Sequence, residues 1–308
     1  MSLSESGLAA ALRRFKPVHL RLLAELDHTG ALGVAAARIG VAQPAASRLL
    51  AEMETLLGLP LHERQGRGLQ LTAVGQALAR RAARIEIELA DAARELAEAA
   101  TGRAGVVRVG AVTGPALSLV MPTLIALQRE LPEFRAEVTV ATSVALCEQL
   151  REGRLDFALA RLSPGETLLE ARIIAGEPLS LVVRRGHPLL VRPILSVDDL
   201  LAFDWVMGDD ETLLTQTVIS RLAELGMERP KRRISTSSFL LTLALLNQTD
   251  AIAPLATPVV DSFAGNPSVP FVSLPIDLGL AVEPFSLVKR AGAQMTPSAQ
   301  RLIDAMLA

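Results

Sequence analysis

The chain has 308 residues, half of them hydrophobic, with 31 basic and 33 acidic side chains and a formal net charge of −2. This length is too great for one ordinary core, so we expect two or three domains. The apolar content and the balanced charge exclude a mainly disordered chain. A chain that is not basic throughout can contact DNA only through a local cluster of positive side chains.

Cysteine and histidine usage narrows the chemistry further. A single cysteine, Cys147, excludes an intramolecular disulfide and fits a reducing compartment. The histidines lack metal-ligand spacing, so we expect neither a metal nor a cofactor. The first charges follow an apolar stretch rather than precede it, and no apolar run reaches the roughly 18 residues that span a bilayer. We therefore expect a cytoplasmic protein.

Residues 17–71 have the pattern of a DNA-binding module. Apolar residues recur at helical spacing in three short segments, 17–28, 32–39 and 43–57. Gly66 and Gly68 then flank Arg67 between two extended pieces, which predicts a β-hairpin. Three short helices followed by a hairpin are typical of a winged helix-turn-helix, whose recognition helix enters the major groove while the wing reaches the backbone or the minor groove.

The segment 43–57 is the recognition helix on this interpretation. Glutamine and arginine side chains can bind adenine and guanine edges, serine suits a phosphate or a base edge, and wing arginines suit phosphates or a narrow minor groove. Any one arginine alone is more simply a solvated charge, but their arrangement in one segment favours DNA contact. The predicted DNA contacts are Gln43, Pro44, Ser47, Arg48, Arg64 and Arg67.

Two stretches of this module resemble the signature of the LysR-type transcriptional regulators, namely AAARIGVAQPAASRLLAEME at 35–54 and LHERQGRGLQLTAVG at 61–75. The resemblance runs from about Pro17 to the C-terminus, weakens after Asp204, and is strongest for the subgroup of protocatechuate and galactose-uptake regulators. It implies a sequence-specific transcription regulator on an inverted-repeat site in double-stranded DNA, modulated by a small-molecule effector. It also implies a homodimer formed through a linker helix and a homotetramer of two such dimers.

Three residues depart from that signature, and residues 1–16 lie outside it. Ala42 replaces the Ser or Thr that usually precedes the Gln-Pro pair, which removes a helix cap of roughly 1 kcal/mol. Ala31 replaces a Ser that often caps the preceding helix. His62 replaces the usual Phe before Glu-Arg.

Residues 73–100 predict one long helix with a coiled-coil seam that pairs two subunits. Apolar residues alternate spacings of four and three along it. The seam consists of Leu78, Ala82, Ile85, Leu89, Ala92, Leu96 and Ala99. The glycines of residues 101–105 predict a hinge.

From Val106 onward, short strands and helices alternate. The order βαβαβ up to Ala160 predicts a parallel sheet. Strands are expected at 106–112, 137–141, 157–160, 179–183, 205–207, 251–253 and 285–289, and helices at 117–130, 144–152, 213–225, 238–246 and 297–307. The resemblance implies a periplasmic-binding-protein-like effector domain of two α/β subdomains.

The predicted fold class is therefore α/β with an N-terminal winged helix-turn-helix. The expected domains are a DNA-binding domain at 1–72 that includes the extension 1–16, a linker helix and hinge at 73–105, and an effector domain at 106–308. Subdomain I is expected at about 106–176 and 276–308, and subdomain II at about 177–275.

Two loops of the effector segment place hydroxyl groups at helix N-termini, where an anion is stabilised. Thr113 and Gly114 follow the first strand, and Thr142 and Ser143 follow the second. The resemblance implies that Thr113, Gly114 and Ser143 hold the carboxylate of a small organic acid. Simple capping of the two helices is the alternative.

Three further residues are candidates for effector contact. Arg161 ends the strand 157–160, where it meets either an anion or a partner in a surface salt bridge. Gly208 and Asp209 follow the strand 205–207, at the place of a third ligand loop. The acidic run 209–211 disfavours a carboxylate nearby and suits hydroxyl groups or an amine.

An enzyme and a transport-type binding protein are the alternatives to a regulator. We find no G-x-S-x-G, phosphate loop, H-E-x-x-H or paired cysteines, and therefore expect no enzyme. A transport-type binding protein fits the effector half alone, but the DNA-binding module and the missing signal peptide oppose it. Trp205, the only tryptophan, is expected in the core, and Cys147 is expected to be a buried small hydrophobe.

Overall fold

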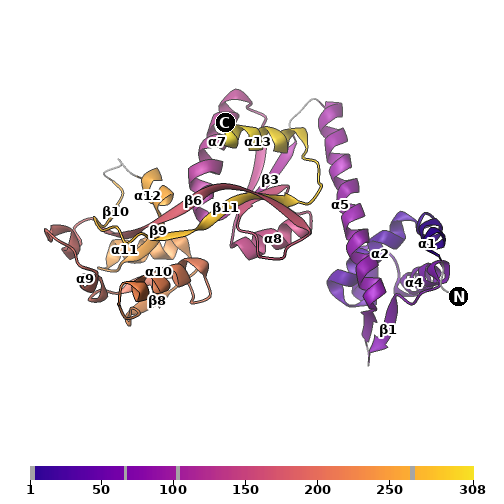
Figure 1. The fold of residues 1–308 in the computed structure, drawn as a ribbon. Coiled ribbons are helices and arrows are strands. Elements are labelled where there is room, and N and C mark those ends of the chain that lie inside the picture. The colour runs from indigo at the N-terminus through magenta and orange to yellow at the C-terminus, as the bar shows by residue number, and fades with distance from the viewer. Residues whose placement is uncertain (1–3, 66–67, 102–104, 264–267) are drawn as a thin grey trace. The chain divides into compact units, whose positions relative to one another are not determined.

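The structure is a computed structural model that describes residues 4–65, 68–101, 105–263 and 268–308. The chain divides into two compact units, Met1–Arg103 and Ala104–Ala308. Figure 1 draws the helices of the first unit in indigo to violet and the mixed sheet of the second in magenta to yellow. Within the described part of the chain, no helix is both long and apolar enough to cross a membrane.

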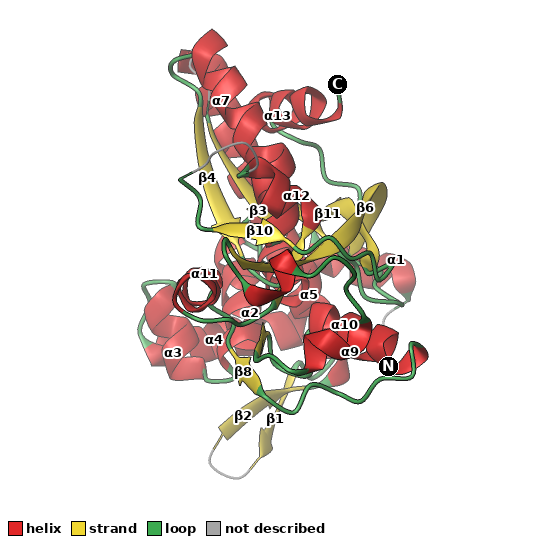
Figure 2. Cartoon of the chain, turned by 90° about the vertical axis from the view of Figure 1, so that its left-hand side faces the viewer, coloured by secondary structure: helices red, strands yellow, loops and turns green. Residues whose placement is uncertain are grey.

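The first unit contains the expected helices and hairpin, together with one further helix. Its elements are α1 (Glu5–Leu12), α2 (Pro17–Thr29), α3 (Leu32–Arg38), α4 (Gln43–Leu57), β1 (His62–Gln65), β2 (Gly68–Leu71) and α5 (Ala73–Thr101). Helix α1 lies in the extension that the sequence pattern left unassigned, and its Leu8 and Ala11 pack onto the core of the unit. Figure 2 shows β1 and β2 as a hairpin that projects from the helices.

Glycines end two of these helices where the chain must turn. Helix α2 ends at Gly30 and α4 at Gly58, with φ values of 61° and 64°. Only glycine adopts this left-handed conformation without strain, and it is the usual C-terminal stop signal of a helix. Pro44 in the first turn of α4 sets the other end of that helix.

The start of α5 belongs to the core of the first unit, which corrects part of the predicted seam. Leu78 and Ala82, expected between subunits, instead pack into the core of this unit, where α5 contacts α2, and Ala82 is fully buried. From Ile85 onward the seam is exposed, with Ile85 at 44%, Leu89 at 53% and Leu96 at 70% exposure. Burial against α2 therefore uses the first turns of the apolar stripe and leaves the rest available for another chain.

The second unit begins with the expected βαβαβ order. Its first elements are β3 (Val106–Ala111), α6 (Thr113–Pro115), a π turn η1 (Ala116–Val120), α7 (Met121–Glu130), β4 (Arg135–Val140), α8 (Ser143–Arg151) and β5 (Phe157–Ala160). Strand β3 lies between β4 and β5 and runs parallel to both. The first helix starts at Thr113 rather than at the expected Leu117, so the predicted loop residues Thr113 and Gly114 are already helical.

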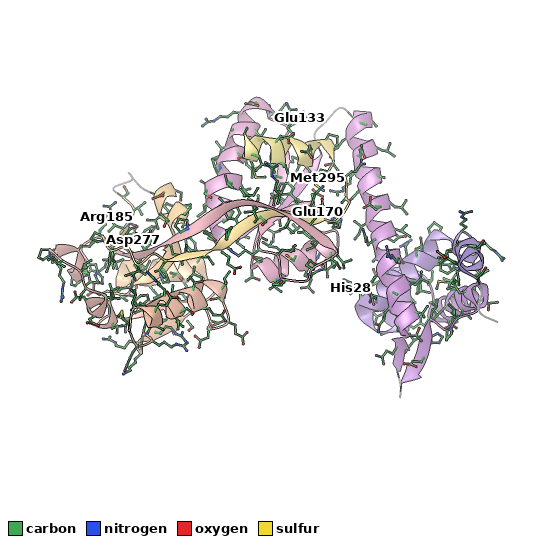
Figure 3. All side chains as sticks on the ribbon, viewed as in Figure 1. His28, Glu133, Glu170, Arg185, Asp277 and Met295 are labelled. Carbon is green, nitrogen blue, oxygen red and sulfur yellow. The ribbon has the colours of Figure 1, made fainter. Side chains whose placement is uncertain are left out.

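Two long strands, β6 (Leu169–Arg184) and β11 (Ala281–Arg290), run through both subdomains of this unit. They pair antiparallel from Leu169 with Arg290 to Pro178 with Ala281. Beyond that point β6 pairs with β9 (Ala253–Ala256) and β10 (Phe271–Ser273). Figure 1 shows the two strands side by side along the unit, and Figure 3 labels Glu170 in the first half of β6 and Arg185 just past its other end.

The sequence predicted only the ends of these strands, at 179–183 and 285–289. Residues 170–176 of β6 are mostly exposed, so they show no apolar alternation that would identify a strand.

The remaining elements build the second subdomain around Trp205. They are η2 (Pro188–Val191), α9 (Val197–Leu201), β7 (Trp205–Met207), α10 (Leu213–Glu224), β8 (Arg233–Ser235), α11 (Phe239–Gln248) and α12 (Thr257–Ser262), and α13 (Pro297–Leu307) closes the chain. Trp205 is fully buried and its Nε1 donates a hydrogen bond to the carbonyl of Leu200 at 3.1 Å. Its predicted place in the core is confirmed.

Candidate functional site

The first four candidate DNA contacts share the exposed side of α4. Gln43, Pro44, Ser47 and Arg48 are all exposed, and the spacing 43, 44, 47, 48 puts them on one side of the helix. Ala46, Leu50 and Met53 on the other side are buried in the core. Among the described residues Arg48 has no hydrogen bond or ion pair, so its guanidinium is available to an outside partner. Ala42 supplies no side-chain cap, as its substitution for Ser or Thr predicted.

The base of the wing is fastened to the recognition helix by Glu54. Its Oε1 accepts hydrogen bonds from the backbone N–H groups of Leu61 at 2.8 Å and His62 at 3.2 Å. The same oxygen lies 2.8 Å from Nδ1 of His62. The carboxylate therefore fixes where the chain enters β1, a role that the sequence analysis missed although Glu54 ends the first family-like stretch.

A close approach fixes the other side of the wing base. A Cβ atom on Gly75, in the first turn of α5, would lie 2.0 Å from the carbonyl oxygen of Leu61. Thr72 reinforces this junction, because its hydroxyl donates to the Pro60 carbonyl at 2.9 Å and accepts the Gly75 N–H at 3.0 Å. Arg64 belongs to β1 by its backbone, and the predicted contact Arg67 lies outside the described residues.

The hydroxyl side chains of three predicted effector residues, Thr142, Ser143 and Thr113, differ in what they bind. Thr142 caps α8 through its hydroxyl, which accepts the N–H of Ala145 at 3.4 Å. The Ser143 hydroxyl instead accepts the backbone N–H of Arg161 at 3.1 Å. Thr113 is half-buried at the start of α6, where Val112 occupies the cap position without a side-chain hydrogen bond. The capping alternative therefore describes Thr142 and does not describe Thr113 or Ser143.

A carboxylate of the protein itself lies among these residues. Glu177, near the middle of β6, forms an ion pair with the guanidinium of Arg161, and the side chains are 8% and 13% exposed. A Cβ atom on Gly114 would lie 1.9 Å from Oε1 of Glu177 and 3.3 Å from Cβ of Ala256. The structure thus places Gly114 and Arg161 against Glu177, a residue that the sequence analysis did not single out, while Ser143 binds the backbone of Arg161.

Arg161 also reaches the second long strand. Its Nε donates a hydrogen bond to the backbone carbonyl of Glu283 at 2.7 Å. Glu283 lies where the pairing between β6 and β11 shifts register, between Val282 and Phe285. The side chain of Arg161 therefore contacts both strands that join the two subdomains. Its salt bridge, expected at the surface, involves a buried glutamate and is only 13% exposed on the arginine side.

The third predicted effector loop, Gly208 and Asp209, makes its hydrogen bonds apart from Arg161 and Glu177. Gly208 and Asp209 form a turn before α10, in which Thr215 and Thr212 donate to their carbonyls at 3.1 Å and 2.9 Å. Asp209 is exposed. Among the residues that the structure describes, no hydrogen bond or ion pair links this loop to Arg161 or Glu177.

Neighbouring Asp210 is held by two arginines. Hydrogen bonds from Arg233 and, to a lesser extent, from Arg229 keep the pKa of its carboxyl below the usual range. This carboxylate is therefore satisfied within the protein.

Cys147 lies in α8 next to the Arg161 backbone. It is buried, and its thiol contacts the carbonyl of Arg161 at 3.8 Å. Burial raises the pKa of the thiol, which keeps it protonated and unreactive. Its expected role as a small buried hydrophobe is consistent with this placement. In the described part of the chain no three His, Cys, Asp or Glu residues gather as a metal site would require.

Comparison with known proteins links both units to one family. Residues 17–76 match the bacterial regulatory helix-turn-helix protein domain of the lysR family, and residues 100–308 match the LysR substrate binding domain. The chain is 40% identical over 253 residues to the HTH-type transcriptional regulator GbpR of Rhizobium radiobacter, covering 80% of this chain and 83% of the relative. It is 33% identical to GbpR of Azospirillum brasilense, covering 96% and 86%.

Solved structures share the fold. Full-length CbnR in complex with its target DNA is similar with a TM-score of 0.59 and 24% identity, over 95% of this chain and 99% of that chain. HinK, a LysR family transcriptional regulator from Pseudomonas aeruginosa, is similar with a TM-score of 0.54 and 18% identity, over 95% and 97%.

Proposed function

The chain belongs to the LysR family of DNA-binding transcription regulators that carry an effector-binding domain, and on that premise we propose which residues do the binding. The proposed DNA contacts are Gln43, Pro44, Ser47, Arg48, Arg64 and Arg67. The observation that carries this assignment is the exposed side of α4, where Ser47 and Arg48 face away from the core and Arg48 has no partner among the described residues. Helix α4 reads bases in the major groove, and the wing binds the phosphate backbone.

Selection from a random pool of duplexes tests this function. The full chain should enrich one inverted-repeat sequence, and its affinity for that duplex should fall steeply with salt because arginines displace counterions from phosphates. If no sequence is enriched and no duplex binds at low salt, the proposed DNA contacts are wrong.

The proposed DNA-binding form is a homodimer paired through α5. Ile85, Leu89 and Leu96 are the large side chains of the exposed part of the seam, and two copies of this stripe would bury one another. A two-fold pair of recognition helices matches an inverted repeat, since the symmetry of the protein is then the symmetry of the site.

The proposed complete assembly is a tetramer of two such dimers. Strand β4 ends the order of the large sheet, and its Val138 and Val140 are 43% and 55% exposed. An edge strand with exposed apolar side chains favours a second contact between copies of the chain.

The proposed effector is a small carboxylate that binds between the subdomains. Gly114 and Arg161 already contact a carboxylate there, that of Glu177, and the Ser143 hydroxyl accepts the backbone N–H of Arg161. Thr113 and Thr142 stand beside them at the starts of α6 and α8, and Gly208 and Asp209 belong to the third loop of the proposed site. Arginine and helix N-termini are the groups that bind carboxylates most strongly.

The proposed division of the chain keeps the DNA-binding domain at 1–72, the linker and hinge at 73–105, and the effector domain at 106–308. Subdomain I takes about 106–176 and 276–308, and subdomain II about 177–275. We place the protein in the cytoplasm, where its DNA is, and assign it no catalytic activity. Neither alternative, an enzyme or a transport-type binding protein, explains the exposed polar side of α4.

A further inference from the structure

We propose that Glu177 is an internal competitor of the effector: its carboxylate occupies the anion position, and an anionic effector binds Arg161 by displacing it. This inference rests on the effector site proposed above and adds how that site is regulated. The site is then closed by the protein itself when no effector is present.

The contacts of Glu177 are those that a bound organic acid would make. Its carboxylate pairs with Arg161, and Oε1 lies directly against Gly114 at the start of the first helix. The backbone N–H of Arg161 is in turn fixed by the Ser143 hydroxyl. Two of the residues predicted to receive a carboxylate, Gly114 and Arg161, therefore contact this carboxylate of the chain, and Ser143 holds the backbone of Arg161.

Charge balance makes simultaneous occupancy unfavourable. The buried pair of Arg161 and Glu177 is neutral, and a second carboxylate beside it would leave an uncompensated negative charge in a site that is largely closed to water. Removing Glu177 from the guanidinium restores the balance. Because Glu177 belongs to the same chain, it competes at a high local concentration, and this raises the effector concentration that is needed.

The exchange acts on the strands that join the subdomains. Glu177 pairs in register with Val282 of β11, and Arg161 holds the carbonyl of the adjacent Glu283. Pro178 and Pro284 donate no backbone hydrogen bond, so the ladder between the two strands is weak at this point. When the effector takes Arg161, the link from Arg161 to β6 breaks. The two strands can then settle into another arrangement, which is the kind of bistable element that a switch requires.

Isothermal titration of the full chain with defined anions tests the proposal. The probes are benzoate and succinate, each compared with its uncharged amide, benzamide and succinamide, at constant ionic strength. Glu177→Gln keeps the shape of the side chain and removes its charge. We expect it to bind at least one of the two carboxylates roughly tenfold more tightly than wild type, the difference that one charge-assisted hydrogen bond makes. Neither amide should gain affinity.

Two further variants make the result specific. Glu177→Gln combined with Arg161→Gln should lose the gain, because the guanidinium that receives the anion is gone. Glu170→Gln, which removes an exposed carboxylate from the same strand, should bind the probes as wild type does. If Glu177→Gln proves poorly folded by circular dichroism, Glu177→Asp replaces it, since its shorter side chain cannot contact Gly114 and Arg161 together and should give a smaller gain of the same sign.

Three results would overturn the proposal. One is equal carboxylate affinity, including no affinity, in wild type and Glu177→Gln. Another is an equal gain for the amides, which would mean that the substitution merely opened the cleft. A gain that survives the loss of Arg161 is the third. Salt-dependent, sequence-specific DNA binding in the same preparations would leave the proposed regulator intact in each case.

Discussion

Gly75 approaches Leu61 so closely that a methyl group on Gly75 would come within 2.0 Å of the Leu61 carbonyl oxygen. This contact joins the first turn of α5 to the strand that starts the wing. Glu54 of α4 accepts hydrogen bonds from the backbone of Leu61 and His62 at the start of that strand. The position of the wing therefore depends on both α4 and α5.

Gly75→Ala should therefore displace the base of the wing. The backbone has to shift to make room, and overpacking of this kind costs about 1–3 kcal/mol of unfolding free energy. We also expect weaker DNA binding, because the wing no longer meets the duplex in register with α4. Denaturant unfolding and fluorescence anisotropy measure the two effects. Gly176→Ala is the matched control, since its added Cβ meets no atom within 4 Å; equal losses in both variants would contradict the close-contact argument.

Arginines on the helix and on the wing should affect DNA binding differently. Arg48→Ala should lower affinity for the selected duplex by roughly 1–3 kcal/mol and relax preference at one base pair, if Arg48 reads a base edge. Arg67→Ala should weaken binding to all duplexes alike and reduce the slope of log K against log salt by about 1, as loss of one phosphate contact does. Salt titrations on specific and scrambled duplexes separate the two outcomes. Identical profiles for the two variants would refute the division of roles.

Charge in the exposed seam should dissociate the dimer. Ile85→Glu combined with Leu89→Glu places carboxylates opposite one another where the apolar stripes would meet, and unpaired buried charges are strongly unfavourable. We expect a smaller species in sedimentation velocity. Ala90→Glu adds charge to an exposed position outside the seam and should leave the oligomer unchanged. A double variant that sediments as wild type would show that α5 does not pair subunits.

Glu86 should make the stability of the chain depend on pH. Burial raises the pKa of its carboxyl, with Arg21 opposing the effect in part, and Oε1 is buried without a hydrogen-bond partner among the described residues. A carboxyl with a raised pKa in the folded state favours folding below its ordinary pKa, and this contribution is lost as pH rises through the raised value.

Glu86→Gln cannot ionise and should therefore raise Tm at pH 7 while changing it much less at pH 4. Thermal unfolding of the full chain at both values measures this difference. Glu88→Gln on the exposed side of α5 is the control and should show no such dependence on pH. An equal gain for Glu86→Gln at both pH values would mean that the charge of Glu86 is not the cause.

Ser143→Ala should weaken the effector response and leave effector-free DNA binding intact. The Ser143 hydroxyl holds the backbone of Arg161 in place, so its loss loosens the guanidinium that receives the anion. Titration of the probe carboxylates in the Glu177→Gln background provides the measurement. Thr113→Val, which removes a second hydroxyl at the start of α6, should also lower affinity. Unchanged affinities in both variants would move the effector site elsewhere, for instance to a subunit interface.

Much of this architecture follows from the sequence because its signals are local. Helix α4 has the predicted bounds Gln43–Leu57, since Pro44 favours its first turn and Gly58 ends it. The buried strand Phe157–Ala160 also has its predicted bounds. A short, fully apolar run of this length is typical of a strand that is buried on both faces. The exposed side of α4 follows in the same way from helical spacing.

Only the tertiary structure decided how these local pieces are used. The apolar stripe on α5 is continuous in sequence, yet packing against α2 takes Ala82 into the core and leaves Ile85 exposed. The first half of β6 forms because β11 supplies its backbone partners, and that pairing leaves no local pattern in the sequence. The sequence predicts that an anion suits Gly114 and Arg161, but it contains many carboxylates. The carboxylate of Glu177 reaches these residues because β6 crosses between the subdomains at that point. A long-range ion pair is set by the path of the chain and not by its local pattern.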